Sequence, residues 1–370
     1  MRQITKVLAA GALLALVGGG AANAQNTLKI GVQVPTTGSS ATDGLDMFHA
    51  AAIARDEINA HGGVLGKKIE LISGDSACDP QQAVNAAAKL VSQKIVGVVG
   101  GYCSGATIPT LKIYGDAHVP FVITASNSTA LIPANPGNAF MINATGDQQA
   151  VTAVTFFKHK KIKTIAIVNE GDAYSQNLAD LTRTAWEKAG GKVVDFETVN
   201  KGEQDYSSVV TAINAKHPDA VFWTAYYADG GLFIRQLRQS GYQGLITVGD
   251  GSNSTKLFDI AGAAGEGVYA FSAPIAESLP AAKSFIATYK KEFKADPGPY
   301  APLTYDGLHL LVWAIHKAGT TNPAAVEKAL SKADGAHWLT GPISFTKKNT
   351  LARSNFVVLE GKNGAWVPVK

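Results

Sequence analysis

The stretch IVGVVGGYCSGATIPTLKIYGDA, residues 95–117, changes its pattern twice. Its first five residues form an apolar run that is typical of a buried strand. Gly100 and Gly101 then begin a short turn, and a helix is expected after Gly105. A glycine-rich turn between a strand and a helix often holds an anionic group at the helix N-terminus. The stretch therefore predicts one strand–helix unit of a parallel sheet, with a candidate binding turn at the end of its strand.

The same alternation of strand and helix continues in both directions from this unit. The other elements predicted in the first half of the chain are strands at residues 28–34, 67–75 and 120–125 and a helix at residues 44–60. A further helix begins after Asp79, because this residue can cap the helix and Pro80 suits the first helical position. Repeated units of this kind predict a parallel sheet with helices on both faces.

A second set of units follows the first. Its predicted strands are at residues 163–170, 192–199, 220–227 and 245–250, and its predicted helices are at residues 148–160, 175–189, 206–216 and 232–241. The remaining predicted elements are helices at residues 281–293 and 302–317 and short strands at residues 343–346, 355–360 and 365–370. No low-complexity linker separates the two halves. We therefore expect an α/β protein with two Rossmann-like lobes that several short crossings connect.

The N-terminus carries the features of a secretory signal peptide. Arg2 and Lys6 form a short basic region, and residues 7–17 form an apolar segment that is too short to span a bilayer comfortably. Residues 22–24 read Ala-Asn-Ala, which matches an A-x-A cleavage signal. We expect cleavage after Ala24 and export to the periplasm through the general secretion route.

The composition limits the classes of partner. Hydrophobic residues make up 46% of the 370-residue chain, charged residues make up 17%, and the net charge is +4. Part of that positive charge lies in the predicted signal peptide, and the one basic cluster is at residues 158–163. Proteins that bind nucleic acid usually present a basic stripe, so we expect no nucleic-acid partner.

The chain has two cysteines, Cys78 and Cys103. In an oxidising compartment an even number of cysteines indicates a disulfide first. A catalytic Cys103 would need a free thiol and a nearby base, so the sequence favours a structural role. The bridge would tie the loop after one strand to the loop after the next.

The sequence lacks the motifs of common enzyme classes. The pentapeptide GYCSG does not fit G-x-S-x-G, the glycines do not have nucleotide-binding spacing, and the histidines do not have metal-ligand spacing. We therefore expect no enzymatic activity, no cofactor and no metal. A secreted hydrolase is the less favoured alternative, because the predicted strand ends offer no histidine as a base.

The predicted strand ends carry the chemistry of a binding site, since open parallel sheets bind ligands beyond the carboxyl ends of their strands. The polar and aromatic residues there are Asp43, Tyr102, Ser104, Ser126, Asn127, Tyr174, Tyr226, Tyr227 and Asp250. A phosphate would normally require a guanidinium group, so a single carboxylate held by hydroxyl and backbone N–H groups fits better. Asp250 could neutralise a cation, and the tyrosines could cover an apolar body. An α-amino acid has all three features.

Several segments of the chain resemble a known family. The chain is similar to the type I periplasmic binding proteins, and most closely to the leucine/isoleucine/valine-binding proteins of ABC importers. The segments that carry the resemblance are INAHGGVLGKKIEL, DSACDPQQAV, YCSGAT, KTIAIVNEGDAYSQ, GEQDYSS, AYYADGG and GPYAPLTYDG. These are its most specific pieces, and the similarity as a whole covers essentially all of the mature chain. The resemblance implies a monomeric carrier that closes on an amino acid, branched-chain or otherwise apolar, and delivers it to a membrane permease.

The family also implies an arrangement of the lobes. Three crossings are expected near residues 144–146, 272–274 and 339–341. The N-terminal lobe would then comprise residues 25–145 and 274–340. The C-terminal lobe would comprise residues 146–273 and 341–370.

The resemblance assigns roles to individual residues. The cysteine pair of the family falls on Cys78 and Cys103, the serine that takes the ligand carboxylate on Ser104, and the acidic residue that takes the ammonium on Asp250. The remaining implied binding positions are the aromatic walls Tyr102, Tyr174, Tyr226 and Tyr300 and the loop Ala125, Ser126 and Asn127.

The sequence departs from the family pattern at two of these positions and at Asp43. Asn127 replaces a threonine, and Tyr102 replaces a residue that is often aliphatic. Asp43 lies where an aromatic residue often contacts the ligand side chain, and burying its charge unpaired would cost several kcal/mol. Either Asp43 turns outward, or the ligand carries a polar or cationic tail. An amide, urea or aromatic acid as ligand, and a sensor role in place of transport, stay open as alternatives.

Overall fold

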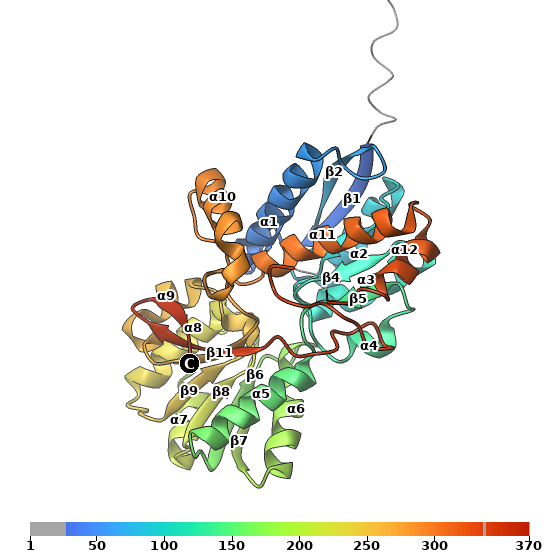
Figure 1. Ribbon diagram of the computed structural model, residues 1–370. Helices are drawn as coiled ribbons and strands as arrows, with labels where there is room; N and C mark the ends of the chain where they lie inside the picture. The colour runs from blue at the N-terminus through green and yellow to red at the C-terminus, as the bar shows by residue number, and fades with distance from the viewer. Residues whose placement is uncertain (1–26, 336–337, 370) are drawn as a thin grey trace, which may run out of the picture.

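The computed structural model describes residues 27–335 and 338–369 of the chain. These residues fold into two lobes, each built on one β-sheet (Figure 1). The predicted signal peptide, residues 1–24, lies outside the described residues. Within the described part of the chain, no helix is long and apolar enough to cross a membrane.

The first lobe contains a parallel sheet with the strand order β2–β1–β3–β4–β5. Its strands are β1 (Thr27–Val34), β2 (Lys68–Asp75), β3 (Val98–Gly100), β4 (Phe121–Ile123) and β5 (Ala139–Met141). The inner strands are short apolar runs, because helices cover both faces of the sheet. Since the strands are parallel, the loops after β1, β3 and β4 meet at one edge.

Two groups of helices cover this sheet. The first group is α1 (Ala41–Ala60), α11 (Ala301–Ala318) and α12 (Pro323–Leu330), and the second is α2 (Pro80–Ser92), α3 (Ser104–Asp116) and α4 (Leu131–Ala134). Helices α1 and α11 pack side by side although they are far apart in sequence (Figure 1). Asp79 caps α2 by accepting a hydrogen bond from the backbone N–H of Gln82 at 2.8 Å, as predicted.

The second lobe contains a mixed sheet with the order β12–β11–β10–β9–β8–β6–β7. Its strands are β6 (Thr164–Asn169), β7 (Lys192–Thr198), β8 (Ala220–Trp223), β9 (Leu245–Val248), β10 (Tyr269–Ser272), β11 (Val357–Lys362) and β12 (Ala365–Pro368). Strands β6 to β10 pair in parallel, and β11 and β12 add an antiparallel edge. The C-terminal segment therefore completes a sheet that begins near the middle of the chain.

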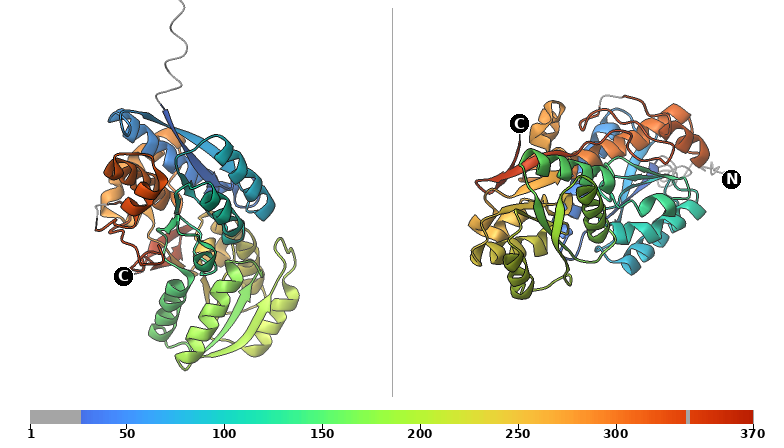
Figure 2. Two further views of the ribbon diagram at one scale, coloured as in Figure 1. Left: turned by 90° about the vertical axis from the view of Figure 1, so that its right-hand side faces the viewer. Right: turned by 90° about the horizontal axis from the view of Figure 1, so that it is seen from below.

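Helices cover both faces of the second sheet, as the two views of Figure 2 show. They are α5 (Gly146–His159) and α6 (Ser175–Lys188) on one face, and α7 (Ser207–Lys216), α8 (Tyr227–Gln239) and α9 (Lys256–Ala261) on the other. Aromatic side chains fill both layers. Phe157 packs edge-on against Trp186 on the α5 side, and Trp223 stacks on Phe233 on the α8 side.

The segment between the lobes' main units is built from short helices. Its elements are η3 (Ala276–Ser278), η4 (Pro280–Ala282) and α10 (Lys283–Phe293). Two other single turns, η1 (Asp250–Ser252) and η2 (Gly262–Gly265), lie in the second lobe on either side of α9. Helix α10 stands beside α1 (Figure 1), where Phe285 and Tyr289 pack with Ile53. The chain thus returns to the first lobe before α11.

Several predicted elements differ from the structure. The strand predicted at residues 343–346 is wrong, because only an isolated bridge joins Phe345 and Leu351 there. The strand predicted at residues 220–227 is too long, since β8 ends at Trp223 and α8 begins at Tyr227. A short apolar strand that runs into a buried first helical turn gives one continuous apolar run, and periodicity cannot divide such a run. The elements that sequence analysis missed are β5, β10, α4, α9 and α12.

The chain passes between the sheets after β5 and again after β10, near the predicted crossings. The last passage lies later than predicted. The backbone N–H of Met141 on β5 donates to the carbonyl of Asn349 at 2.8 Å, and Met141 also forms a bridge with Thr350. The chain therefore leaves the first lobe after Leu351 and not at residues 339–341. The other lobe boundaries stay a prediction.

Candidate ligand-binding site

The glycine-rich turn after β3 shapes the first-lobe side of the site. Gly100 and Gly101 have φ angles of 122° and 77°, which glycine adopts easily and other residues rarely do. A Cβ atom on Gly100 would lie 2.4 Å from the carbonyl oxygen of Gln33, so glycine lets β3 end in close contact with β1. The chain then presents Tyr102 to the second lobe and begins α3 at Ser104.

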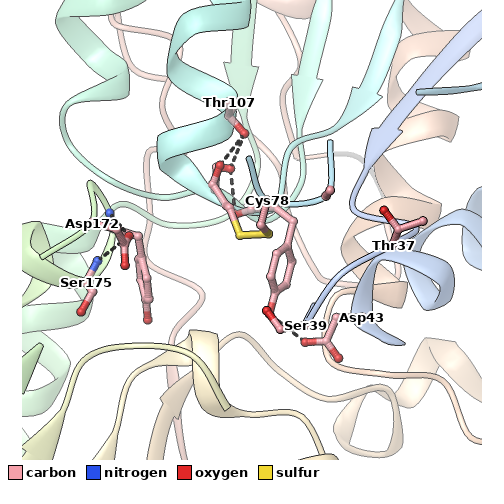
Figure 3. Close-up of a disulfide and its surroundings, with 12 residues drawn as sticks. Thr37, Ser39, Asp43, Cys78, Thr107, Asp172 and Ser175 are labelled. Carbon is pink, nitrogen blue, oxygen red and sulfur yellow. Dashed lines mark hydrogen bonds between the residues drawn. A yellow bond between two sulfur atoms is a disulfide. The ribbon is translucent and has the colours of Figure 1, made fainter. Parts of the chain in front are cut away.

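Cys103, directly before α3, forms the predicted disulfide with Cys78. Their Cα atoms are 5.3 Å apart, and the bond links the turn after β3 to the loop after β2. Figure 3 shows the disulfide between Thr107 of α3 and Asp43 of α1. Because its sulfur is bonded to Cys78, Cys103 is structural and not a nucleophile.

A small cavity of about 10 Å³ lies between the two lobes. The first lobe contributes Tyr102, Ala125, Asn127 and Tyr300 to its lining, and the second lobe contributes Tyr174, Tyr226, Asp250 and Gly251. Apart from Gly251, all of these are predicted site residues. The structure therefore brings the loops of both lobes together at one place.

Four tyrosine rings surround the cavity. The ring of Tyr102 lies edge-on to Tyr300 with 5.4 Å between centroids, and it lies 5.9 Å from Tyr226. Tyr174 lies 5.3 Å from Tyr226. Burial raises the pKa of all four hydroxyl groups well above its usual value. The rings therefore offer neutral hydroxyl groups to a ligand at neutral pH.

Asp250, shortly after β9, is buried and accepts hydrogen bonds from both lobes. The Tyr174 hydroxyl donates at 2.8 Å, and the side-chain amides of Asn127 and Asn143 donate at 3.1–3.2 Å. Burial raises the pKa of Asp250, and the bonds from these residues and from Gln149 oppose that rise. Among the described residues that line the cavity, none is lysine, arginine or histidine. No cation of the cavity wall therefore balances the Asp250 carboxylate.

Ser104 and Ser126 lie just outside the cavity wall. The backbone N–H of Ser104, at the start of α3, interacts with the Tyr226 hydroxyl and lowers its pKa against the larger effect of burial. The Ser126 hydroxyl donates to the carbonyl of Tyr102 at 2.9 Å and lies 2.8 Å from the Thr107 hydroxyl. Ser126 therefore holds the Tyr102 loop in place.

Asp43 lies inside the protein and has partners there, an arrangement that neither sequence-based expectation included. Its carboxylate accepts a hydrogen bond from the Tyr102 hydroxyl at 2.8 Å, and Ser254 of the second lobe is a further partner. Burial raises the pKa of Asp43 to about 6, and these hydrogen bonds oppose the rise. In Figure 3 a dashed line marks the hydrogen bond that the Asp43 carboxylate accepts.

A larger cavity of about 800 Å³ lies on the other side of Asp43. Its lining includes Asp43, Asp46 and His49 of α1, residues 253–256 of the second lobe, and the segment before α11. Asp43 borders this cavity, while its partner Tyr102 borders the small one. The Asp43–Tyr102 pair therefore stands between the two spaces.

Sequence analysis missed three residues of the site. Asn143 and the fully buried Gln149 support the Asp250 carboxylate, and they flank the crossing after β5. A Cβ atom on Gly251 would lie 2.8 Å from the ring of Tyr174. Asn143 and Gln149 could have been predicted as site residues, because they are polar and lie beside a predicted crossing. For Gly251 the only signal in the sequence is its position next to Asp250. Within the described residues, no group of potential ligands could hold a metal ion.

Comparison with known proteins identifies a family and several relatives of this chain. The family model described as "Periplasmic binding protein" matches residues 27–365. An "Amino acid binding protein" of Pseudomonas aeruginosa is 32% identical over 338 residues, which are 90% of this chain and 89% of that protein. The leucine binding protein LivK of Thermotoga maritima has 27% identity and a TM-score of 0.87, and it covers 93% of this chain and 98% of its own. LivJ of Streptococcus pneumoniae, solved in complex with isoleucine, has 26% identity and a TM-score of 0.84, and the match covers 93% of this chain and 100% of LivJ.

Proposed function

The chain belongs to the periplasmic binding protein family, and we propose that it binds an α-amino acid with an apolar side chain between its lobes. The observation that carries the proposal is the buried Asp250 carboxylate, which no cation of the cavity wall balances. A buried charge without a counter-charge is costly, and a ligand ammonium group would supply that counter-charge. The relatives named for amino acids, leucine and isoleucine support the same class of ligand.

The ligand carboxylate binds at the opposite side of the cavity, at the N-terminus of α3. The backbone N–H groups at a helix N-terminus attract anions, and Ser104 adds a hydroxyl group. In the structure the Tyr226 hydroxyl interacts with the Ser104 N–H, and the Asn127 amide donates hydrogen bonds to the Asp250 carboxylate. The ligand's carboxylate and ammonium take the places of these two protein groups.

Contacts between the lobes complete the site. The Tyr300 hydroxyl donates to the carbonyl of Asp250 at 2.8 Å, and the Tyr227 hydroxyl donates to the carbonyl of Ser39 at 2.9 Å. Such contacts form only when the lobes close, so binding and hinge closure are coupled. Ala125 and the tyrosines shape the walls of the closed site, and Ser126 holds the Tyr102 loop behind them.

The protein acts as a carrier in the periplasm, the compartment for which its family is named. It delivers its ligand, as a monomer, to the membrane permease of an ABC transporter. The signal peptide is removed after Ala24. A sensor that reports the same ligand would use the same site.

Calorimetric titration tests the proposal. The mature protein is unfolded and refolded to remove carried ligand, and is titrated with L-alanine, L-valine, L-leucine, propionate and ethylamine. We expect binding of amino acids only. Asp250→Asn should weaken that binding at least about 30-fold, because removing one partner of a buried charge pair costs about 2–5 kcal/mol. The exposed Asp259, paired with Lys256, provides the control Asp259→Asn, which should bind as the wild type does.

Two results would contradict the proposal. Propionate that binds as tightly as the amino acids would remove the role of the ammonium group. If no amino acid binds, an amide, urea or aromatic acid becomes the better candidate.

A further inference from the structure

We infer that Tyr102, held in place by Asp43, limits the ligand to a side chain of about the size of a methyl group. This inference rests on the proposed function, because it assigns a size to the amino acid that the site would bind. It makes Tyr102 a specificity-determining residue and Asp43 a positioning residue that acts through it.

The volume of the cavity sets the size limit. The ligand's carboxylate and ammonium replace the Tyr226 hydroxyl and the Asn127 amide, so the remaining space is left for the side chain. That space is about 10 Å³, which holds about one water-sized group. The methyl group of alanine is of this size. The isobutyl group of leucine is several times larger and would have to move a wall of the cavity.

Tyr102 is the wall that decides the size. Its ring packs against Tyr226 and Tyr300 from both lobes, and its side chain is 6% exposed. Its backbone is fixed as well, because Ser126 donates to its carbonyl and Cys103 follows it in the chain. An aliphatic residue here would leave the volume of an aromatic ring free for a larger ligand side chain.

Asp43 prevents the Tyr102 ring from moving aside. The Asp43 side chain is 2% exposed, and the Tyr102 hydroxyl donates to it at 2.8 Å. Hydrogen bonds to ionised groups are stronger than those between neutral groups. If Tyr102 swings away, Asp43 stays buried and loses this partner, which a buried carboxylate tolerates poorly. Closed lobes therefore hold the ring across the site.

The same geometry argues against a cationic ligand tail at Asp43. Its carboxylate is directed at the Tyr102 hydroxyl and at Ser254, and the Tyr102 ring stands between it and the small cavity. A lysine or arginine ligand would have to displace the ring before reaching the charge. Asp43 thus acts by positioning the Tyr102 ring and not by binding a charged group of the ligand.

The test is the ratio of the affinities for alanine and leucine. We expect the wild-type protein to bind L-leucine at least about tenfold more weakly than L-alanine, because overpacking a well-packed site is destabilising. Tyr102→Leu should reverse the preference, and Tyr102→Phe and Asp43→Ala, which each remove the hydrogen bond between the two side chains, should each reduce the ratio by freeing the ring. Tyr242→Phe is the matched control, since Tyr242 is a buried tyrosine of the second lobe whose hydroxyl donates to Pro218; its ratio should equal that of the wild type.

Each outcome has a separate meaning. If the wild type binds leucine as tightly as alanine, or binds lysine or arginine more tightly than either, the inference is wrong while the proposed function stands. If Tyr102→Leu folds and leaves the ratio unchanged, Tyr102 does not set the specificity. If no amino acid binds the wild type, the proposed function fails, and this inference fails with it. The wild-type series decides the question even if a variant does not fold.

Discussion

Asp46 provides a stability prediction with a magnitude that follows from the structure. One carboxylate oxygen accepts hydrogen bonds from the Tyr289 hydroxyl at 2.6 Å and the Gly298 N–H at 2.7 Å, and the other oxygen is buried without a partner. The side chain is 8% exposed. Burial is the main cause that raises its pKa from 3.8 to about 7, and the negative charges of Asp43 and Glu277 add to it.

The sign of the pH effect follows from the two pKa values. Between pH 3.8 and about 7 the folded protein holds a proton on Asp46 that the unfolded chain has released. The contribution of this group to stability therefore falls as the pH rises through that range, and it is constant above it. With one pKa unit equal to 1.36 kcal/mol, the full cost above pH 7 is about 4 kcal/mol.

Asp46→Asn removes the titration and keeps an oxygen for Tyr289 and Gly298. We expect the variant to exceed the wild type in free energy of unfolding by an amount that grows by about 3 kcal/mol between pH 5 and pH 8. Urea unfolding at a series of pH values measures this difference. Asp56→Asn, at an exposed position of the same helix, should show no such growth. A constant difference between Asp46→Asn and the wild type at all pH values would refute the reasoning.

Two further predictions concern the disulfide and the contact between the lobes. Replacing Cys78 and Cys103 with serine should lower the free energy of unfolding by about 3.5 kcal/mol, because the bond closes a loop with a sequence separation of 25; equal urea midpoints for the variant and the wild type would contradict this. Asn127→Ala should shift the ligand-free protein toward a more open form, since it removes an interlobe hydrogen bond to a charged group that contributes about 1.5–3 kcal/mol. Small-angle X-ray scattering should then give a larger radius of gyration, and an unchanged radius would show that Asn127 does not hold the lobes together.

Local patterns in the sequence were sufficient for much of the fold. Asp79 and Pro80 marked the start of α2 correctly, and the long periodic segments gave α1, α5 and α11 nearly in full. The strand β5 was missed, because its apolar run at residues 139–142 is shorter than the runs that marked the equally short strands β3 and β4. The segment at residues 343–346 has the composition of a strand, but its neighbours in space leave it only one bridge. Such pairing depends on tertiary contacts that the local sequence does not contain.

The candidate site, like the fold, could be predicted only in part from the sequence. Tyr102, Asn127 and Asp250 could be predicted, because each follows a recognisable strand and the ends of parallel strands meet. The buried, hydrogen-bonded state of the Asp43 carboxylate could not be predicted. Its partner Tyr102 is 59 positions away and approaches it only in the folded lobe. A buried charge in a sequence indicates that a partner exists, but not which residue provides it.

A crystal structure of the protein with L-alanine is the most direct test of the central claim. We expect the alanine ammonium at about 2.8–3.0 Å from the Asp250 carboxylate and the alanine carboxylate at the N–H and hydroxyl groups of Ser104. The Asn127 amide and the Tyr226 hydroxyl should have moved from these two positions, and the alanine methyl group should face Tyr102. An alanine bound in the reverse orientation, or outside the space between Ser104 and Asp250, would contradict the account.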